Sequence, residues 1–390
     1  MAELSQILLA ARGVGREHEP LWLATVMRVK GSAYRHAGAR MLFSSGQVLA
    51  GSVSGGCLEA GIVRKGPWLS RERPACISFD GSHEAGDDEE APRGTGCDGI
   101  VDILIERVQF GTPCSPLSVI EDCLHSERRT VLATVFQSND PLAPVGARLT
   151  LDEHGEFSTH GLSGPAWATL ARASSEAMAA PGSGARVIAS DGIEALLEVI
   201  EPPPHLFVIG AGPDARPMVE FATALGFGVT VCETNARVAV RERFAQRASL
   251  HVGSIDSIAS QIAARRTPVA VVMSHHYPTD LQALGMLLGS RAAYIGMLGP
   301  ARRTRRMLQE MFGEGASLSH RDRARLRAPI GLDLGAETPA QIALSVIAEV
   351  QAVLAHASAL PLSEKRRPIH GLVPTLDVPA EAELGKTGTA

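Results

Sequence analysis

The chain has 390 residues, a length that favours two or three domains over a single one. With a formal net charge of −5 and only 4% aromatic residues, it lacks the broad positive surface and the stacking side chains of a nucleic-acid binder. No stretch approaches the roughly 20 apolar residues of a membrane span, and the N-terminus has no basic segment leading into an apolar run. We therefore expect a cytoplasmic protein with no nucleic-acid partner and no membrane span.

The first 200 residues contain a degenerate internal duplication. Two short motifs occur twice, 109 and 108 residues apart: Leu23–Val26 with Leu132–Val135, and Gly38–Arg40 with Gly146–Arg148. Each copy, about 20–70 and about 129–180, has the pattern of an apolar strand, a turn, a hairpin and a helix. The sequence therefore predicts an N-terminal α+β domain over residues 1–200.

The two copies differ where reactive side chains would lie. The first contains the run Ser52–Glu59, whereas the corresponding run Gly161–Ala168 of the second contains neither Cys nor Glu. This difference suggests one working site, in the first copy, and one supporting copy.

Cys57 follows a glycine turn at the predicted start of a helix. The positive end of the helix dipole would hold the pKa of this thiol below its usual value of about 8.5. Such a thiol would be a nucleophile or a ligand of a soft metal, the alternative being a small buried apolar side chain. Cys97 lies in a second glycine-rich segment, after an acidic stretch over 81–90 that we expect to be a mobile loop, and could share the site. The six cysteines lack CxxC pairs, so we predict no structural metal site.

A proline run at 202–204 separates this domain from a different one. After it, apolar strand-like segments alternate with helix-length segments, which is the pattern of a parallel sheet with helical crossovers. The last strong helix is predicted to begin after Thr338, an N-cap residue that is followed by Pro339. The sequence therefore predicts an α/β chain, with a Rossmann-like domain over 201–360 and a loosely ordered tail over 361–390.

A glycine-rich motif follows the first strand of this second domain. Gly210, Gly212 and Ala215 form a GxGxxA pattern between an apolar strand and an amphipathic helix. In such a motif the first glycine makes a tight turn, the second lets the backbone approach a pyrophosphate, and the alanine permits close helix packing. Glu233 follows the next strand, where an acid can bind ribose hydroxyls. The pattern predicts a dinucleotide-binding fold and leaves open whether the crevice binds NAD(P), another nucleotide or a phosphate.

Later strands of the same domain precede further candidate residues. His275 ends a strand segment and Asp280 lies early in the next helix. Because open α/β sheets bind ligands at the carboxyl ends of their strands, we predict that His275 is an acid, a base or a phosphate contact that Asp280 orients. Two further pairs could line the same crevice: Arg302 and Arg303 at the start of a helix, and Asp333 and Glu337 in a glycine-containing loop.

Long stretches of both domains resemble the XdhC/CoxI family. The stretches that carry the resemblance are Gly31–Arg35, Gly38–Met41 and Gly51–Glu59 in the first domain, and Ser274–His275, Asp280, Ala293–Gly299 and Pro329–Pro339 in the second. The likeness covers about two thirds of the chain and joins both domains in the expected order. Two residues depart from the family pattern, since Ser274 stands where Thr is frequent and Asp98 stands where a second glycine usually follows the cysteine.

The resemblance implies a cofactor chaperone or insertion factor rather than an enzyme. Such a protein binds molybdenum cofactor (molybdopterin), protects it while a cysteine desulfurase supplies the terminal sulfur, and delivers it to an apo molybdenum hydroxylase of the xanthine dehydrogenase type. The resemblance also implies a homodimer. On this interpretation the reactive residues are Cys57, Cys97 and His275, and Cys57 is a candidate molybdenum contact. The residues that would bind cofactor in the first domain are Ser54, Gly55, Gly56, Cys57 and Glu59.

Two other functions compete with this one. The first is an NAD(P)-dependent oxidoreductase that binds nicotinamide in the Rossmann-like domain and uses Cys57 or His275 for catalysis. The second is a nucleotide-regulated scaffold without catalysis. The residues alone do not identify the molybdoenzyme that would be served, nor the ligand of the Rossmann-like crevice.

Overall fold

The structure is a computed structural model in which the chain divides into two compact units. One comprises Glu3–Glu201 with His370–Ala390, and the other comprises Pro202–Ile369 with Met1–Ala2; we call them the N-terminal and the C-terminal unit. The structure describes residues 2–14, 19–80, 99–109, 111–112, 114–180, 182, 184–190, 192–235, 244, 247–313, 318–364 and 375–377. The acidic stretch over 81–90 and the candidate residue Cys97 lie outside this part of the chain. None of the described helices has both the length and the apolar composition that a membrane crossing requires.

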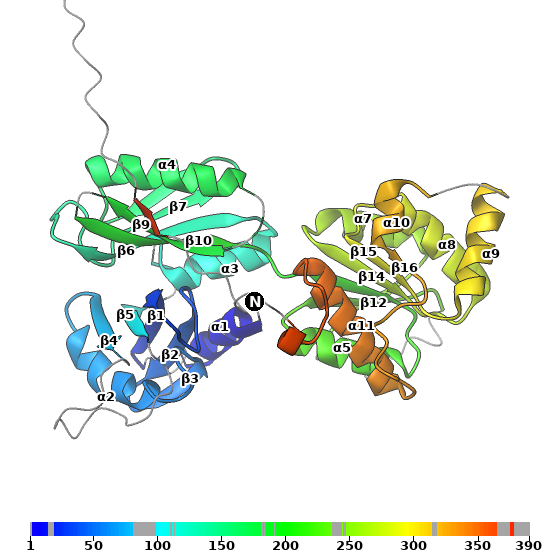
Figure 1. Ribbon diagram of the computed structural model, residues 1–390, viewed down its shortest axis with the longest axis horizontal. Coiled ribbons are helices and arrows are strands. Elements are labelled where there is room, and N and C mark those ends of the chain that lie inside the picture. Colours follow the sequence, from blue (N-terminus) through cyan, green and yellow to red (C-terminus); the bar gives the residue numbers. More distant parts are fainter. Residues whose placement is uncertain are drawn as a thin grey trace, which may run out of the picture. The chain divides into compact units, whose positions relative to one another are not determined.

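The N-terminal unit is built from two copies of one arrangement of helices and strands (Figure 1). The first copy comprises α1 (Ala2–Val14), β1 (Leu21–Lys30), β2 (Arg40–Ser44), β3 (Gln47–Gly51), α2 (Glu59–Leu69), β4 (Ala75–Asp80) and β5 (Ile100–Val108). The second comprises α3 (Pro116–Ser126), β6 (Thr130–Ser138), β7 (Arg148–Asp152), β8 (Phe157–His160), α4 (Pro165–Ala179), β9 (Gly184–Ser190) and β10 (Ile193–Ile200). The sheets have the orders β3-β2-β1-β5-β4 and β8-β7-β6-β10-β9, so the predicted duplication is confirmed. Each copy also includes a preceding helix and two following strands that the sequence comparison did not reach.

The recurring sequence motifs mark a recurring backbone geometry. In the first copy Gly38 donates its N–H to the carbonyl of Val26 at 2.8 Å, and in the second Gly146 donates to Val135 at 2.8 Å. Both glycines have φ close to +90°, a conformation that favours glycine. The pairing of β1 with β5 and that of β6 with β10 are each interrupted by a bulge one residue further along the first strand. The motifs therefore recur because the same turn follows the same bulged strand.

Reciprocal buried ion pairs join the two copies. Arg40 on β2 pairs with Glu198 on β10 at 2.6 Å, and Arg148 on β7 pairs with Glu106 on β5. All four side chains are at most 8% exposed, so neither charge can be left without its partner at low cost. Both copies also contribute to one apolar cluster: Met27, Leu104, Phe136, Val187 and Leu196.

A short strand lies in the tail after residue 360, where the sequence predicts loose order. The strand β17 (Thr375–Asp377) pairs in parallel with β9, and it is drawn in red beside that strand in Figure 1. The tail also contains a 3-10 turn, η1 (Leu362–Glu364). The second sheet of the N-terminal unit thereby has six strands, in the order β17-β9-β10-β6-β7-β8.

The C-terminal unit has one parallel sheet with helical crossovers. Its elements are β11 (His205–Ile209), α5 (Ala215–Ala224), β12 (Gly228–Glu233), β13 (Ser249–Val252), α7 (Asp256–Ala264), β14 (Pro268–Val272), α8 (Tyr277–Leu288), β15 (Tyr294–Met297), α9 (Ala301–Phe312), α10 (His320–Arg325), β16 (Leu326–Arg327) and α11 (Pro339–Leu354). The strand order is β13-β12-β11-β14-β15-β16, which is the 3-2-1-4-5-6 order of a Rossmann fold. The predicted fold class is therefore confirmed, and helix α11 begins with the predicted cap, Thr338, in a complete capping box.

Candidate functional site

The run Ser52–Glu59 forms a tight loop between β3 and α2 in the N-terminal unit. The carboxylate of Glu59 accepts hydrogen bonds from the N–H groups of Val53 (3.2 Å), Ser54 (2.9 Å) and Leu58 (3.2 Å), and from the Ser54 hydroxyl. The Ser54 oxygen in turn accepts from the N–H groups of Gly56 and Leu58, each at 3.1 Å. Glu59 therefore holds the loop in shape, and its contact with a cofactor stays a prediction.

Two of the three N-terminal stretches that carry the family resemblance, Gly31–Arg35 and Gly51–Glu59, lie against each other. Glu3 on α1 accepts a hydrogen bond from Arg35 and another from the N–H of Ser52 at 3.1 Å. The ring of Tyr34 stands over Gly55, where a side chain would begin 3.6 Å from the ring. The loop after β1 and the loop after β3 thus form one surface, although about 20 residues separate them in the sequence.

Cys57 lies in this surface, two residues before the first residue of helix α2. Its free side chain is half-buried. At the preceding Gly56, φ is +111°, and apart from its two chain neighbours no atom of the described residues lies within 4 Å of the place where a side chain would begin. A ligand therefore has room beside this glycine, and the sulfur donor of the next residue suits a soft metal or a sulfur-bearing group. Within the described ranges, no group of three or more His, Cys, Asp or Glu residues is arranged to hold a metal ion.

Glu59 gives this loop a pH-dependent stability. Burial alone would raise the pKa of the Glu59 carboxyl, but the hydrogen bonds from Ser54 and from backbone N–H groups lower it below its usual value of about 4.3. Because the pKa of Glu59 is lowered only in the folded state, its carboxylate stabilises the folded N-terminal unit fully at a pH above the pKa of the unfolded chain. This stabilisation is lost as the pH falls through the pKa of the folded state. We expect Glu59→Gln to lower the urea midpoint of the N-terminal unit at pH 7, and by progressively less towards pH 3.

Tryptophan fluorescence is the appropriate measurement for that experiment, because all three tryptophans of the chain lie in the N-terminal unit. A difference between the two proteins that stays constant from pH 7 to pH 3 would show that the Glu59 charge does not stabilise the loop.

In the C-terminal unit, the predicted residues gather where the strand order reverses, at the carboxyl ends of β11 and β14. Gly210 has φ of +122°, and a side chain there would begin 2.6 Å from the carbonyl oxygen of Met273. Gly210 is therefore required for the contact between the two strand ends as well as for the turn. Ala215 is fully buried at the start of α5, as expected of a residue that permits close packing.

The hydrogen-bond donors of the glycine loop are partly occupied by the protein's own acids. Glu233 accepts from the N–H of Ala211 at 3.0 Å and from that of Asn235 at 3.0 Å, so its carboxylate is engaged with the backbone. Asp214 is the N-cap residue of α5, and its side chain lies so close to Gly212 that a side chain there would begin 2.5 Å from it. A carboxylate at this helix end places negative charge where the helix dipole would otherwise favour a bound anion.

His275 and Asp280 have different partners from those that the sequence predicts. His275, in a left-handed conformation with φ of +60°, contacts Asp214 through Nε2 at 2.7 Å. Asp280 is only 2% exposed; it accepts from the Ser274 hydroxyl at 2.5 Å and pairs with Arg303 at 2.8 Å. The expectation that Asp280 orients His275 is therefore wrong, because the first turn of α8 places its carboxylate among buried polar groups. Asp214, which the sequence did not single out, has that position.

The remaining candidates of the C-terminal unit are exposed. Arg302 on α9, and Asp333 and Glu337 in the loop before α11, all lie at the surface. Glu337 contacts the side chain of Gln341 through its backbone N–H at 3.1 Å, as part of the helix start. Arg303, one of the two arginines that were candidates for binding a phosphate, forms an ion pair with Asp280.

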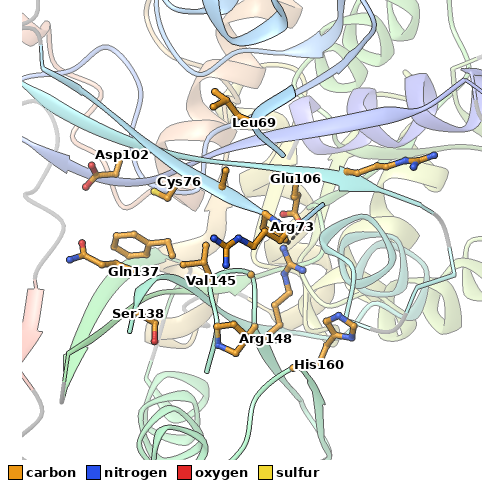
Figure 2. A pocket seen from close by; sticks show the side chains of 18 of the residues that line it. Leu69, Arg73, Cys76, Asp102, Glu106, Gln137, Ser138, Val145, Arg148 and His160 are labelled. Atoms are coloured by element: carbon orange, nitrogen blue, oxygen red, sulfur yellow. Dashed lines mark hydrogen bonds and ion pairs between the residues drawn. The ribbon is translucent and has the colours of Figure 1, made fainter. Parts of the chain in front are cut away.

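The N-terminal unit also contains a cleft that the sequence did not reveal, and none of the predicted site residues lines it. It has a volume of about 1090 Å³ and lies between the two copies, with Arg73, Cys76, Glu106, Arg148 and His160 among its lining residues (Figure 2). These residues come from distant parts of the sequence. One lining residue, Arg148, stood out in the sequence because it repeats Arg40. The duplication accounts for that repeat without any ligand site.

Comparisons with known proteins match both units. A family model described as the XdhC and CoxI family matches residues 15–80, and one described as the XdhC Rossmann domain matches residues 206–350. The chain is 30% identical over 336 residues to a probable xanthine dehydrogenase subunit of Bacillus subtilis (strain 168), and the match covers 86% of this chain and 93% of that protein. It is 30% identical over 172 residues to the uncharacterized protein YqeB of Escherichia coli (strain K12), a match that covers 43% of this chain but 31% of that protein. A crystal structure of a xanthine dehydrogenase from Bacillus halodurans has a TM-score of 0.70 and 25% identity, and covers 93% of this chain and 97% of that chain.

Proposed function

Because this chain belongs to the XdhC and CoxI family, we propose that it is an accessory protein in the maturation of a xanthine dehydrogenase-type molybdoenzyme. In this role it binds molybdenum cofactor, protects it during sulfuration by a cysteine desulfurase, and delivers it to the apo molybdenum hydroxylase as a homodimer. The relative from Bacillus subtilis, whose name refers to xanthine dehydrogenase, supports the choice of partner.

The observation that carries the cofactor proposal is the setting of Cys57. The loop that precedes α2 is fixed from inside by Glu59, so the thiol has a defined position without a ligand. The open space beside Gly56 admits a group next to the sulfur. The cofactor would supply a molybdenum centre with sulfur ligands, and the role of Cys57 would be to hold that end of the cofactor through its sulfur.

Cofactor content tests this proposal directly. The chain would be purified from cells that make molybdenum cofactor, and bound molybdenum and pterin would be measured for wild type, Cys57→Ala and Cys232→Ala. Cys232 is a matched control, because burial raises the pKa of its thiol to about 12 and keeps it protonated. We expect stoichiometric molybdenum and pterin in wild type and in Cys232→Ala, and at least a tenfold loss in Cys57→Ala. Wild-type protein that carries neither would contradict the proposal.

The NAD(P)-dependent oxidoreductase is the second candidate, because the C-terminal unit has the Rossmann strand order and the GxGxxA motif. Asp214 at the start of α5 weighs against it, since it places negative charge at the helix end beside the glycine loop. Tight binding of NAD(P) to a wild-type chain that carries no pterin would favour this candidate.

A further inference from the structure

The cleft between the two copies of the N-terminal unit has the size of a ligand site. At about 1090 Å³ it reaches the upper end of the roughly 300–1,000 Å³ that small-molecule pockets occupy. One wall is formed by β4 and β5 of the first copy, and the other by the end of β6 and the segment 139–148 of the second copy. Figure 2 shows Arg73 and Arg148, one from each wall, among the side chains that line it.

The duplication provides an internal comparison that shows what is particular to this cleft. Arg40 and Arg148 are equivalent residues, and each pairs with a buried glutamate of the other copy. Arg40 also donates from Nη1 to the carbonyl of Gly38 at 2.9 Å. Within the described part of the chain, Nη1 of Arg148 makes no corresponding bond, while the Nε groups of both arginines are equally buried without a hydrogen-bond partner. Because Arg148 lines the cleft, its Nη1 is a donor for a bound molecule.

The two copies also differ at the edges of their sheets. Cys76 on β4 pairs with Leu104, and the equivalent Val187 on β9 pairs with Leu196. Strand β17 pairs with β9 on its other side, whereas among the described residues β4 is the last strand of its sheet, and Ala75, Cys76 and Ser78 of this strand line the cleft.

The charges around the cleft favour an anion. Its carboxylates already have partners in the protein: Asp102 binds Arg28 at 2.6 Å, Glu106 binds Arg148, and Asp140 accepts from the N–H of Leu142 at 2.8 Å. The side chains of three further lining residues, Arg73, Arg107 and His160, have no ion-pair or hydrogen-bond partner among the residues that the structure describes. The Ser115 hydroxyl, also in the lining, is buried without a partner in the same part of the chain.

We propose that this cleft binds a small molecule that carries a phosphate monoester, and that Arg148 and Arg73 bind its phosphate. Guanidinium groups match the geometry of phosphate oxygens, and a partly buried arginine with free N–H groups binds an oxyanion more strongly than an exposed one. The volume accommodates a heterocycle attached to the phosphate, so the ligand is a mononucleotide or a pterin phosphate. The inference goes beyond the proposed function, because it concerns a different site and does not require a molybdenum-bearing ligand.

Binding would be measured by isothermal titration calorimetry on the full chain, purified from cells that cannot make molybdenum cofactor. The probes are inorganic phosphate, adenosine monophosphate, a pterin phosphate monoester, and adenosine as the control without phosphate. The variants are Arg73→Ala and the double variant Arg148→Gln/Glu106→Gln, which removes both charges of the buried pair together. The matched control is Arg40→Gln/Glu198→Gln, which removes the equivalent pair away from the cleft.

We expect wild type and the Arg40→Gln/Glu198→Gln control to bind at least one phosphate monoester, and not adenosine. Affinity should fall by about tenfold or more in Arg73→Ala and in Arg148→Gln/Glu106→Gln, because each loses charged hydrogen bonds to phosphate. Preference for adenosine monophosphate or for the pterin phosphate identifies the source of the phosphate. The proposal is overturned if wild type binds none of the three phosphates, or if both cleft variants bind them as wild type does. Neither outcome depends on the molybdenum content that tests the proposed function.

Discussion

Alanine in place of Gly210 is expected to destabilise the C-terminal unit by about 3 kcal/mol or more. Two effects add at this position. The backbone has φ of +122°, which an alanine adopts only with strain, and the new methyl group would lie 2.6 Å from the carbonyl oxygen of Met273. Because that neighbour is backbone at the end of the central strand β14, relief requires the two strands to separate.

Hydrogen–deuterium exchange measures this effect separately in each unit. Amides of β11 should lose protection in Gly210→Ala, whereas amides of β6 in the N-terminal unit serve as the internal reference. Two control variants separate the causes. At Gly313 φ is +84° but nothing lies within 4 Å of a new side chain, so Gly313→Ala tests backbone strain alone, at about 1 kcal/mol. The second control is Gly212→Ala, where the atom nearest to the new methyl group belongs to the Asp214 carboxylate, which can rotate away. Protection in Gly210→Ala equal to that in Gly313→Ala would show that the contact with Met273 is unimportant.

Removing one partner of a buried ion pair between the copies should have a comparable effect. We expect Arg40→Gln to lower the free energy of unfolding of the N-terminal unit by about 3 kcal/mol, because Glu198 would remain buried without its cation. The double variant Arg40→Gln/Glu198→Gln should recover most of that loss, since two neutral amides can still form a hydrogen bond.

Urea unfolding followed by tryptophan fluorescence reports on this unit alone, since the three tryptophans all lie within it. The reciprocal variants, Arg148→Gln and Arg148→Gln/Glu106→Gln, should behave in the same way. If the double variant is as unstable as the single one, then the single variant is not destabilised by an unpaired buried charge, and the two side chains stabilise the unit through their packing.

The overall fold was predictable from the sequence because its signals are local or repetitive. The alternation of strands and helices after residue 202, with GxGxxA after the first strand, predicts the parallel sheet that is observed. The duplication was visible because Gly38 and Gly146 must adopt the same positive φ after the same bulged strand. The extra elements of each copy escaped detection because strands such as β5 and β10 keep only their apolar pattern and share no short motif.

The candidate sites were predictable only in part. Local sequence placed Cys57 in a glycine loop. The hydrogen bonds that Glu59 makes to Ser54 depend on its carboxylate folding back over that loop, which local sequence does not specify. Likewise, the spacing of His275 and Asp280 suggested a pair, whereas the crossover of the sheet brings Asp214, 61 residues earlier, to His275. The cleft between the copies had no local signal, because its lining comes from both halves of the N-terminal unit.

By itself, the sequence determined the duplication, the Rossmann-like fold class and the family, because each depends on periodicity, glycine conformation or contiguous motifs. Only the tertiary structure decided which charges meet. Arg40 and Arg148 are indistinguishable in their motifs, yet Arg40 donates to the carbonyl of Gly38 while Arg148 makes no such bond among the described residues and lines a cleft. The physical reason is that such contacts join segments far apart in the chain, as where β17 pairs with β9, and no local pattern specifies them.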